Sequence, residues 1–119
     1  MKKTLVLGAS LNPSRYSHLA VQSLQAAGVP VVAIGLRNGS IGQTHIVTGK
    51  PSLQDIHTIT LYMNANNQKM WYEYIFSLNP KRIIFNPGAE NDELQSLAMA
   101  RGIEATVGCT LVMLRTGQF

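Results

Sequence analysis

The chain has 119 residues, 45% of them hydrophobic, and a formal net charge of +4. A chain of this length can bury a core of its own without disulfides or a structural metal, so we expect one domain over residues 1–119. Its single cysteine, Cys109, excludes an internal disulfide, and no Cys/His spacing resembles a zinc site, which indicates a reduced, cytoplasmic setting. The apolar run after Lys2 and Lys3 is too short for a signal peptide or a membrane span.

Positive charge dominates the first half of the chain, because the first acidic residue is Asp55. A basic segment without local carboxylates attracts polyanions, either nucleic acids or phosphorylated small molecules. Basic runs and interleaved surface aromatics would favour nucleic acid, but only two adjacent basic pairs occur. We therefore favour a phosphorylated small molecule. The basic residues of this half are Lys2, Lys3, Arg15, Arg37 and Lys50.

Short apolar runs that alternate with helical patterns predict an α/β fold. Continuous runs of this kind are typical of strands buried on both faces. We expect strands at Thr4–Leu7, Val31–Ile34, Thr58–Met63 and Arg82–Phe85, and a fifth within Ala105–Leu114 that is followed by frayed terminal residues. The alternation predicts a three-layer Rossmann-like fold, with a mainly parallel five-stranded sheet in the order 3-2-1-4-5 and helices on both faces.

Capping signals delimit the helices between these strands. The predicted helices run from Asn12-Pro13 to Gly28, through an apolar face at Met70–Leu78 to Asn79-Pro80, and from Asn91 to Gly102. The segment Arg37–Ile56 is rich in Gly, Ser, Thr and Pro. We predict that this segment is a long functional loop, in which only residues 45–47 are briefly extended.

The stretch Leu7–His18, LGASLNPSRYSH, connects the first predicted strand to the first helix. Gly8 allows a ligand to approach the backbone closely, and Ser10 and Ser17 offer hydroxyl groups. The amino end of the helix adds free N–H groups and a positive dipole end, and Arg15 adds a bidentate donor. Together these groups suit a pyrophosphate. The alternative is a turn that only connects the strand to the helix.

The loop after the fourth predicted strand, Asn86–Asn91, is expected to face this stretch. In an open parallel sheet, ligands bind beyond the carboxyl ends of the strands, where the winding reverses. The predicted order puts that point between the first and fourth strands, so the two loops meet there. The acidic residues Glu90, Asp92 and Glu93 suit the first turn of the next helix, which explains them without acid–base catalysis.

The sequence argues against NAD as the ligand. The fingerprint G-x-G-x-x-G is missing, as is the acidic residue about twenty positions further on that would hold the ribose hydroxyls. The second strand instead ends in Gly35-Leu36-Arg37, where Arg37 suits a ribose that carries a phosphate. NADP and coenzyme A both carry such a phosphate and both remain open, as does a solvated loop position for Arg37.

Several weak motifs occur in one order along nearly the whole chain. They are Gly8-Ala9-Ser10, Asn12-Pro13, Arg15-Tyr16-Ser17, Ile41-Gly42, Ser52-Leu53-Gln54-Asp55-Ile56, Asn86-Pro87-Gly88-Ala89, and Gly102-Ile103 with Cys109. In this order the chain resembles the small standalone CoA-binding-domain proteins, which are similar to the amino-terminal domain of the succinyl-CoA synthetase alpha subunit.

The resemblance implies a Rossmann-like fold that holds the ADP part of CoA against the first loop and the ends of the second and fourth strands. It implies a phosphate loop and an opposite wall, with Tyr16 either shaping the pocket or belonging to the core. One departure is that Gly35-Leu36-Arg37 stands where many members have Asn-Pro, so either Arg37 replaces the lost contacts or the ligand differs. The implied loop residues are Gly8, Ala9, Ser10, Asn12, Arg15 and Ser17, and the implied wall residues are Pro87 and Gly88.

The residues indicate neither catalysis nor a metal site. His18, His45 and His57 lack metal-ligand spacing and are interpreted as solvated or capping residues. Cys109 is interpreted as a packing residue, and the alternative is a mixed disulfide with the thiol of CoA. The aromatic residues within 71–76 surround most of their helix, which predicts core packing with scattered exposure; a homo-oligomer interface is the alternative.

The sequence therefore predicts a small nucleotide-binding module that binds CoA or an acyl-CoA noncovalently, without evident catalysis. Such a module would act as a sensor or with a separate partner enzyme. The alternative is an NADP-linked oxidoreductase or NADP-binding regulator that uses the same loops, although a Tyr-x-x-x-Lys pair is missing. A second alternative is a nucleic-acid-binding or purely interacting module.

Overall fold

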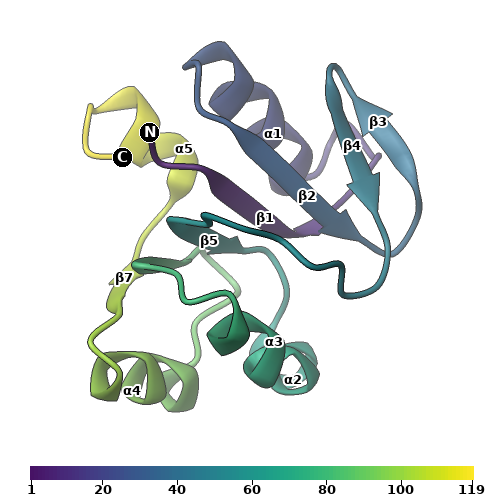
Figure 1. The fold of residues 1–119 in the computed structure, drawn as a ribbon. Coiled ribbons are helices and arrows are strands. Elements are labelled where there is room, and N and C mark those ends of the chain that lie inside the picture. The colour runs from purple at the N-terminus through teal and green to yellow at the C-terminus, as the bar shows by residue number, and fades with distance from the viewer.

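A computed structural model describes residues 1–119 as a seven-stranded sheet with helices on both faces (Figure 1). The strands are β1 (Thr4–Ala9), β2 (Val31–Gly35), β3 (Gly39–Ile41), β4 (Thr44–Val47), β5 (Thr58–Leu61), β6 (Arg82–Phe85) and β7 (Glu104–Val107). The helices are α1 (Tyr16–Ala26), α2 (Ala65–Gln68), the 3₁₀-helix η1 (Lys69–Trp71), α3 (Tyr72–Ser77), α4 (Asp92–Ala100) and α5 (Thr110–Arg115). All neighbouring strands are parallel except β3 and β4, which confirms the expected α/β, Rossmann-like class.

The strand order is β3-β4-β2-β1-β5-β6-β7, so the predicted order and the predicted number of five strands were wrong. The third predicted strand, β5, pairs with β1, where Leu5 lies opposite Ile59. Its expected place beside β2 is taken by β4, where Ala33 lies opposite Ile46. The winding therefore reverses between β1 and β5 and not between β1 and β6. The loops that follow β1 and β5 meet at the carboxyl edge of the sheet.

The prediction of a loop over Arg37–Ile56 was wrong in its first part, which forms the β3–β4 hairpin, although the extended segment expected at residues 45–47 lies within β4. The two strands pair antiparallel around Gly42, with Ser40 opposite His45. Gln25 of α1 holds the hairpin by donating to the carbonyl oxygen of Ile41 at 2.7 Å and to Oγ1 of Thr44 at 2.6 Å. The remaining residues, 48–57, connect β4 to β5 without a helix or strand.

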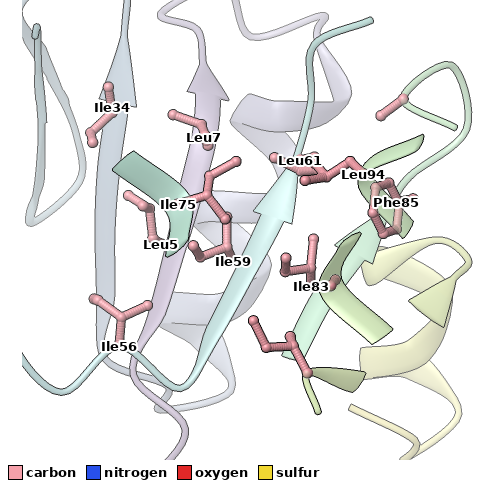
Figure 2. Close-up of a cluster of buried hydrophobic side chains, with 13 residues drawn as sticks. Leu5, Leu7, Ile34, Ile56, Ile59, Leu61, Ile75, Ile83, Phe85 and Leu94 are labelled. Carbon is pink, nitrogen blue, oxygen red and sulfur yellow. The ribbon is translucent and has the colours of Figure 1, made fainter. Parts of the chain in front are cut away.

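Alternate residues of each strand point to opposite faces of the sheet and build two apolar layers. Leu5 and Leu7 belong to the larger cluster, which packs under α3 and α4 (Figure 2). Val6 belongs to the smaller cluster, which packs under α1 and contacts Leu114 of α5. In Figure 1, α1 and α5 lie on one face of the sheet, and α2, α3 and α4 lie on the other.

Two helix boundaries differ from the prediction. Asn12 does not cap α1, because its Oδ1 accepts from the N–H of Ser14 at 3.0 Å inside the loop. The helix begins only at Tyr16, after Arg15. The second predicted helix is divided into α2, η1 and α3. The predicted cap of α4 is confirmed, since Oδ1 of Asn91 accepts from a first-turn N–H at 3.0 Å.

The carboxyl-terminal apolar run forms a short strand and then a helix. Asn86 Oδ1 accepts from the N–H of Thr110 at 2.9 Å, and Thr60 hydrogen-bonds to the Thr110 hydroxyl at 2.7 Å, so the start of α5 is tied to the sheet. The expectation of frayed terminal residues was wrong. The carbonyl oxygen of Phe119 accepts from Arg82 Nη1 at 2.7 Å, and its ring centroid lies 4.5 Å from that guanidinium. No helix of the structure has the length and apolar character needed to cross a membrane.

Candidate ligand-binding site

Two adjoining cavities open at the carboxyl edge of the sheet. The large cavity, of about 940 Å³, lies among the loops that follow β1, β2 and β5. The small cavity, of about 660 Å³, lies among the start of α1, the loop after β6, and α5. Both cavities are lined by Arg15, Ser17, Tyr62, Met63 and Asn64. A long ligand that crosses these shared residues would occupy both cavities.

The loop after β1 is shaped by the absence of a side chain at Gly8. Gly8 has a φ of +103°, and a Cβ there would lie 2.8 Å from the carbonyl oxygen of Tyr62. The glycine thus lets the end of β1 pack against the backbone that follows β5. Past this point, Ser10 Oγ accepts from the N–H of Asn12 at 3.1 Å, and Asn12 in turn holds Ser14. These local hydrogen bonds fix the loop before any ligand arrives.

The amino end of α1 lies at the junction of the two cavities without a capping side chain. Arg15 is its N-cap residue, and no side chain accepts from the first turn. The helices α2 and α4 are capped by Asn64 and Asn91, whereas α3 and α5, like α1, have no capping side chain. Free N–H groups and the positive end of the helix dipole therefore remain available beside Arg15 and the buried Ser17. This arrangement suits an anionic oxygen cluster.

The basic residues of the first half separate into two groups. Lys2 and Lys3 donate to the carbonyl oxygens of Phe119 and Gln54, which line neither cavity. Lys50 is not a lining residue, but it donates to the carbonyl oxygen of Met70, which lines the large cavity. Arg15 and Arg37 both line the large cavity, and their guanidinium groups make no hydrogen bond within the chain. No Asp or Glu lines either cavity. Arg15 and Arg37 are thus the two cations of this half that line a cavity, and both can bind an anion there.

The structure brings the sequence-predicted site residues together in two sets. Gly35 and Arg37 line the large cavity beside the first loop, while Pro87 and Gly88 face the start of α1 across the small cavity. The loop after β6 therefore lines the small cavity and not the large one. The large cavity is also lined by Gly8, Ala9, Ser10 and Asn12, and the small cavity by Tyr16. Both cavities are lined by Arg15 and Ser17.

Sequence reasoning missed the residues that follow β5. Tyr62, Met63 and Asn64 line both cavities, and the large cavity adds Met70 and Trp71. The wrong strand order hid them, because it placed β5 away from β1. The signal that would have found them is their position directly after a fully buried strand, since all parallel strands end at the same edge.

Tyr62 lies at the junction of the two cavities and carries a buried hydroxyl group. Its hydroxyl is buried and has no hydrogen-bond partner in the chain. Burial raises the pKa of Tyr62 to about 12. The side chain is therefore a neutral hydrogen-bond donor at physiological pH.

The helix α5 supplies the remaining wall of the small cavity. Cys109, which precedes α5, lines this cavity together with Leu111, Val112 and Arg115. Cys109 is half-buried and unpaired. Its position two residues after β7 agrees with the expected place near the end of the last strand.

The histidines lie outside both cavities and make local hydrogen bonds. Nδ1 of His18 is 3.0 Å from the carbonyl oxygen of Ser10, and Nδ1 of His57 is 2.7 Å from Oγ1 of Thr58. Nδ1 of His45 is 2.9 Å from Oγ of Ser40. No group of three His, Cys, Asp or Glu residues is arranged to hold a metal ion. The aromatic residues within 71–76 are half-buried and pack against the larger core cluster.

Comparison with known proteins agrees with this architecture. The family described as CoA binding domain matches residues 2–115. A crystal structure of an uncharacterized protein is 45% identical, with a TM-score of 0.96 over 100% of this chain and 98% of that chain. The structure of cell-free ID.343 from Thermus thermophilus is 18% identical, with a TM-score of 0.86 over 99% of this chain and 90% of that one. No curated protein matches the chain.

A hypothetical protein from Pyrococcus horikoshii OT3 is also 18% identical, with a TM-score of 0.82 over 98% of this chain and 83% of that chain. At this identity it shares the fold alone, as does the Thermus thermophilus structure. The sheet and its edge cavities define a Rossmann-like α/β protein. The chain belongs to the CoA binding domain family, as the order of its motifs predicted.

Proposed function

We propose that the protein binds CoA or an acyl-CoA noncovalently, with the pyrophosphate at the amino end of α1. The observation that carries this proposal is the uncapped helix start beside Arg15, at the junction of two cavities. The pyrophosphate is the middle of CoA, and the adenosine and the pantetheine arm extend from it in two directions. Two cavities on either side of one phosphate site match that shape.

The large cavity takes the adenosine in this proposal. Leu36 and Met70, which line it, are 97% and 69% exposed, and Trp71 lines the same cavity. Exposed apolar side chains around a cavity favour a flat, apolar ring such as adenine. Arg37 lines the same cavity without an internal partner and would pair with the phosphate on the ribose.

The small cavity takes the pantetheine arm. Its wall combines the apolar side chains of Leu111 and Val112 with Cys109 and Tyr62. The arm would leave the pyrophosphate at Arg15 and enter between α5 and the loop at Pro87. Since the ionisable residues that line the small cavity are two arginines, two tyrosines and one cysteine, we propose binding and delivery to a partner enzyme without a reaction on this chain.

A panel of ligand-induced melting shifts tests the proposal. CoA at a hundredfold excess over its dissociation constant adds about 2.7 kcal/mol to stability, which raises Tm by several degrees. NADP, NAD and ATP at the same concentration should raise it less. A larger shift with NADP than with CoA would contradict the proposal.

The ribose phosphate is tested by comparing CoA with 3′-dephospho-CoA. CoA should bind the native protein about fivefold more tightly, and Arg37→Gln should remove that difference while leaving dephospho-CoA binding unchanged. Lys81→Gln is the matched charge control, because Lys81 is exposed at the opposite, amino end of β6. Equal affinities of the native protein for the two ligands would show that Arg37 does not contact the ribose phosphate.

A further inference from the structure

We propose that the small cavity prefers an acyl-CoA whose acyl group ends in a carboxylate, with Arg115 as the counter-charge. This inference rests on the proposed function, since it assigns the far end of the same ligand. It adds the class of acyl group, which the adenosine and pyrophosphate contacts leave open.

The position of Arg115 follows from one face of α5. Leu111, Val112 and Arg115 all line the small cavity. Residues three and four apart lie on the same side of a helix, so Arg115 is the neighbour of both apolar residues. A ligand arm that runs along this face meets apolar side chains first and a cation at the end of the helix. That sequence of surfaces matches an aliphatic chain that ends in an anion.

The charge of Arg115 is not used within the chain. Its guanidinium makes no hydrogen bond, and no carboxylate lines the cavity. Arg15, the other cation of the small cavity, is already assigned to the pyrophosphate. A neutral acyl group would leave Arg115 without an anionic partner in the complex, whereas a terminal carboxylate would accept its bidentate donors.

The wall that carries Arg115 is held at both ends. At the start of α5, the N–H of Thr110 donates to Asn86 at 2.9 Å. Beyond its end, the N–H of Gln118 donates to the carbonyl oxygen of Met113 at 2.8 Å, and Phe119 is anchored by Arg82 at 2.7 Å. The backbone at Arg115 is therefore fixed before the ligand binds, which lowers the entropic cost of the contact.

Arg115 has a competing structural role, because a cation in the last turn of a helix interacts favourably with the helix dipole. The two roles make different predictions. If the role is structural, substitution of Arg115 lowers stability and changes the affinity for every ligand to the same extent. The proposed role affects only ligands that carry the terminal carboxylate.

The test compares two stable thioethers of CoA by isothermal titration. S-carboxyethyl-CoA and S-propyl-CoA have chains of equal length and differ only in the terminal carboxylate. We expect the native protein to bind the carboxylated thioether about fivefold more tightly. Arg115→Gln should remove this preference and leave the affinity for S-propyl-CoA unchanged, while Arg115→Lys should keep part of it.

Each outcome decides one proposal. Equal affinity of the native protein for the two thioethers, or a preference that survives in Arg115→Gln, overturns the assignment of Arg115. Binding of S-propyl-CoA in either case leaves the proposed function standing. Failure of CoA and of both thioethers to bind overturns the proposed function and, with it, this inference. A melting curve of each variant identifies any loss of folding.

Discussion

Gly8 and Tyr62 pack backbone against backbone at the point where β1 and β5 end. The φ of Gly8 is +103°, and a Cβ there would lie 2.8 Å from the carbonyl oxygen of Tyr62. This contact joins the first loop to the residues that line both cavities, so the geometry of the site depends on it.

Gly8→Ala should therefore destabilise the protein by about 3 kcal/mol, because it combines a disfavoured backbone angle with a clash against backbone that cannot rotate away. Gly49→Ala is the matched control: Gly49 has a φ of +79° but no atom within 4 Å of the added Cβ. It should cost only about 1 kcal/mol. Urea unfolding measures both, and equal losses would show that the contact with Tyr62 is not tight.

Asn86, directly after β6, should be a polar residue at which substitution strongly lowers stability. Its buried amide donates to Thr60 Oγ1 at 2.6 Å and to the carbonyl oxygen of Leu61 at 2.9 Å, and it accepts from the N–H of Thr110. Asn86→Leu removes the acceptor of the Thr110 N–H and the donor to the carbonyl oxygen of Leu61, while Thr60 keeps its hydrogen bond to Thr110. It should lower the free energy of unfolding by about 3 kcal/mol. Asn66→Leu, at an exposed position of α2, should change it by no more than about 0.5 kcal/mol. Similar unfolding midpoints for both variants would show that the hydrogen bonds of Asn86 do not stabilise the fold.

Cys109 reports directly on the small cavity, because it lines that cavity and is the only cysteine of the chain. The free protein should react with one equivalent of an aromatic disulfide reagent such as DTNB. Bound S-propyl-CoA, which has no free thiol that could consume the reagent, should slow this reaction about tenfold or more, since the pantetheine arm covers the thiol of Cys109. The absorbance of the released thiolate gives the rate. An unchanged rate at saturating S-propyl-CoA would mean that the arm lies elsewhere.

His57 should make stability depend on pH. Burial, followed by the charge of Arg82, lowers the pKa of His57 below 6.5 in the folded state. The unfolded chain therefore binds more protons between the lowered pKa and 6.5, so stability rises with pH through that window. Above pH 6.5 the stabilisation is complete, and it is lost as the pH falls through the folded-state pKa.

Thermal unfolding from pH 4.5 to 7.5 measures this dependence. His57→Gln should flatten the rise of Tm with pH below pH 6.5. His45→Gln, a control at an exposed position of the hairpin, should leave that rise unchanged. If both variants follow the native curve, His57 does not cause the dependence.

The central strands were predictable from the sequence because they are buried on both faces. Residues 4–7, 58–61 and 82–85 are all buried, so their apolar or β-branched runs are continuous, and the predicted strands overlap β1, β5 and β6. The hairpin was not predictable in this way. β3 has three residues and β4 has four, with an alternation of buried and exposed residues too short to distinguish from a loop.

The strand order was missed for a different reason. The amino acids at residues 58–61 do not indicate whether that strand pairs with β2 or with β1. The hairpin decides the pairing, because it occupies the edge of β2. The site was accordingly half predictable. Gly8, Ser10, Arg15 and Arg37 were found from local loop chemistry, whereas Tyr62, Met63 and Asn64 become site residues only through the observed pairing of β1 with β5.

Binding of CoA at the start of α1 is tested by isothermal titration of the native protein and of Arg15→Gln with CoA. We expect one CoA per chain and an affinity about tenfold lower in Arg15→Gln, because that variant loses a charge-assisted contact with the pyrophosphate. Lys81→Gln, with the same change of charge at the opposite edge of the sheet, should bind CoA as the native protein does. Absence of binding heat with CoA, or equal affinity in Arg15→Gln and Lys81→Gln, would mean that CoA does not bind at the start of α1.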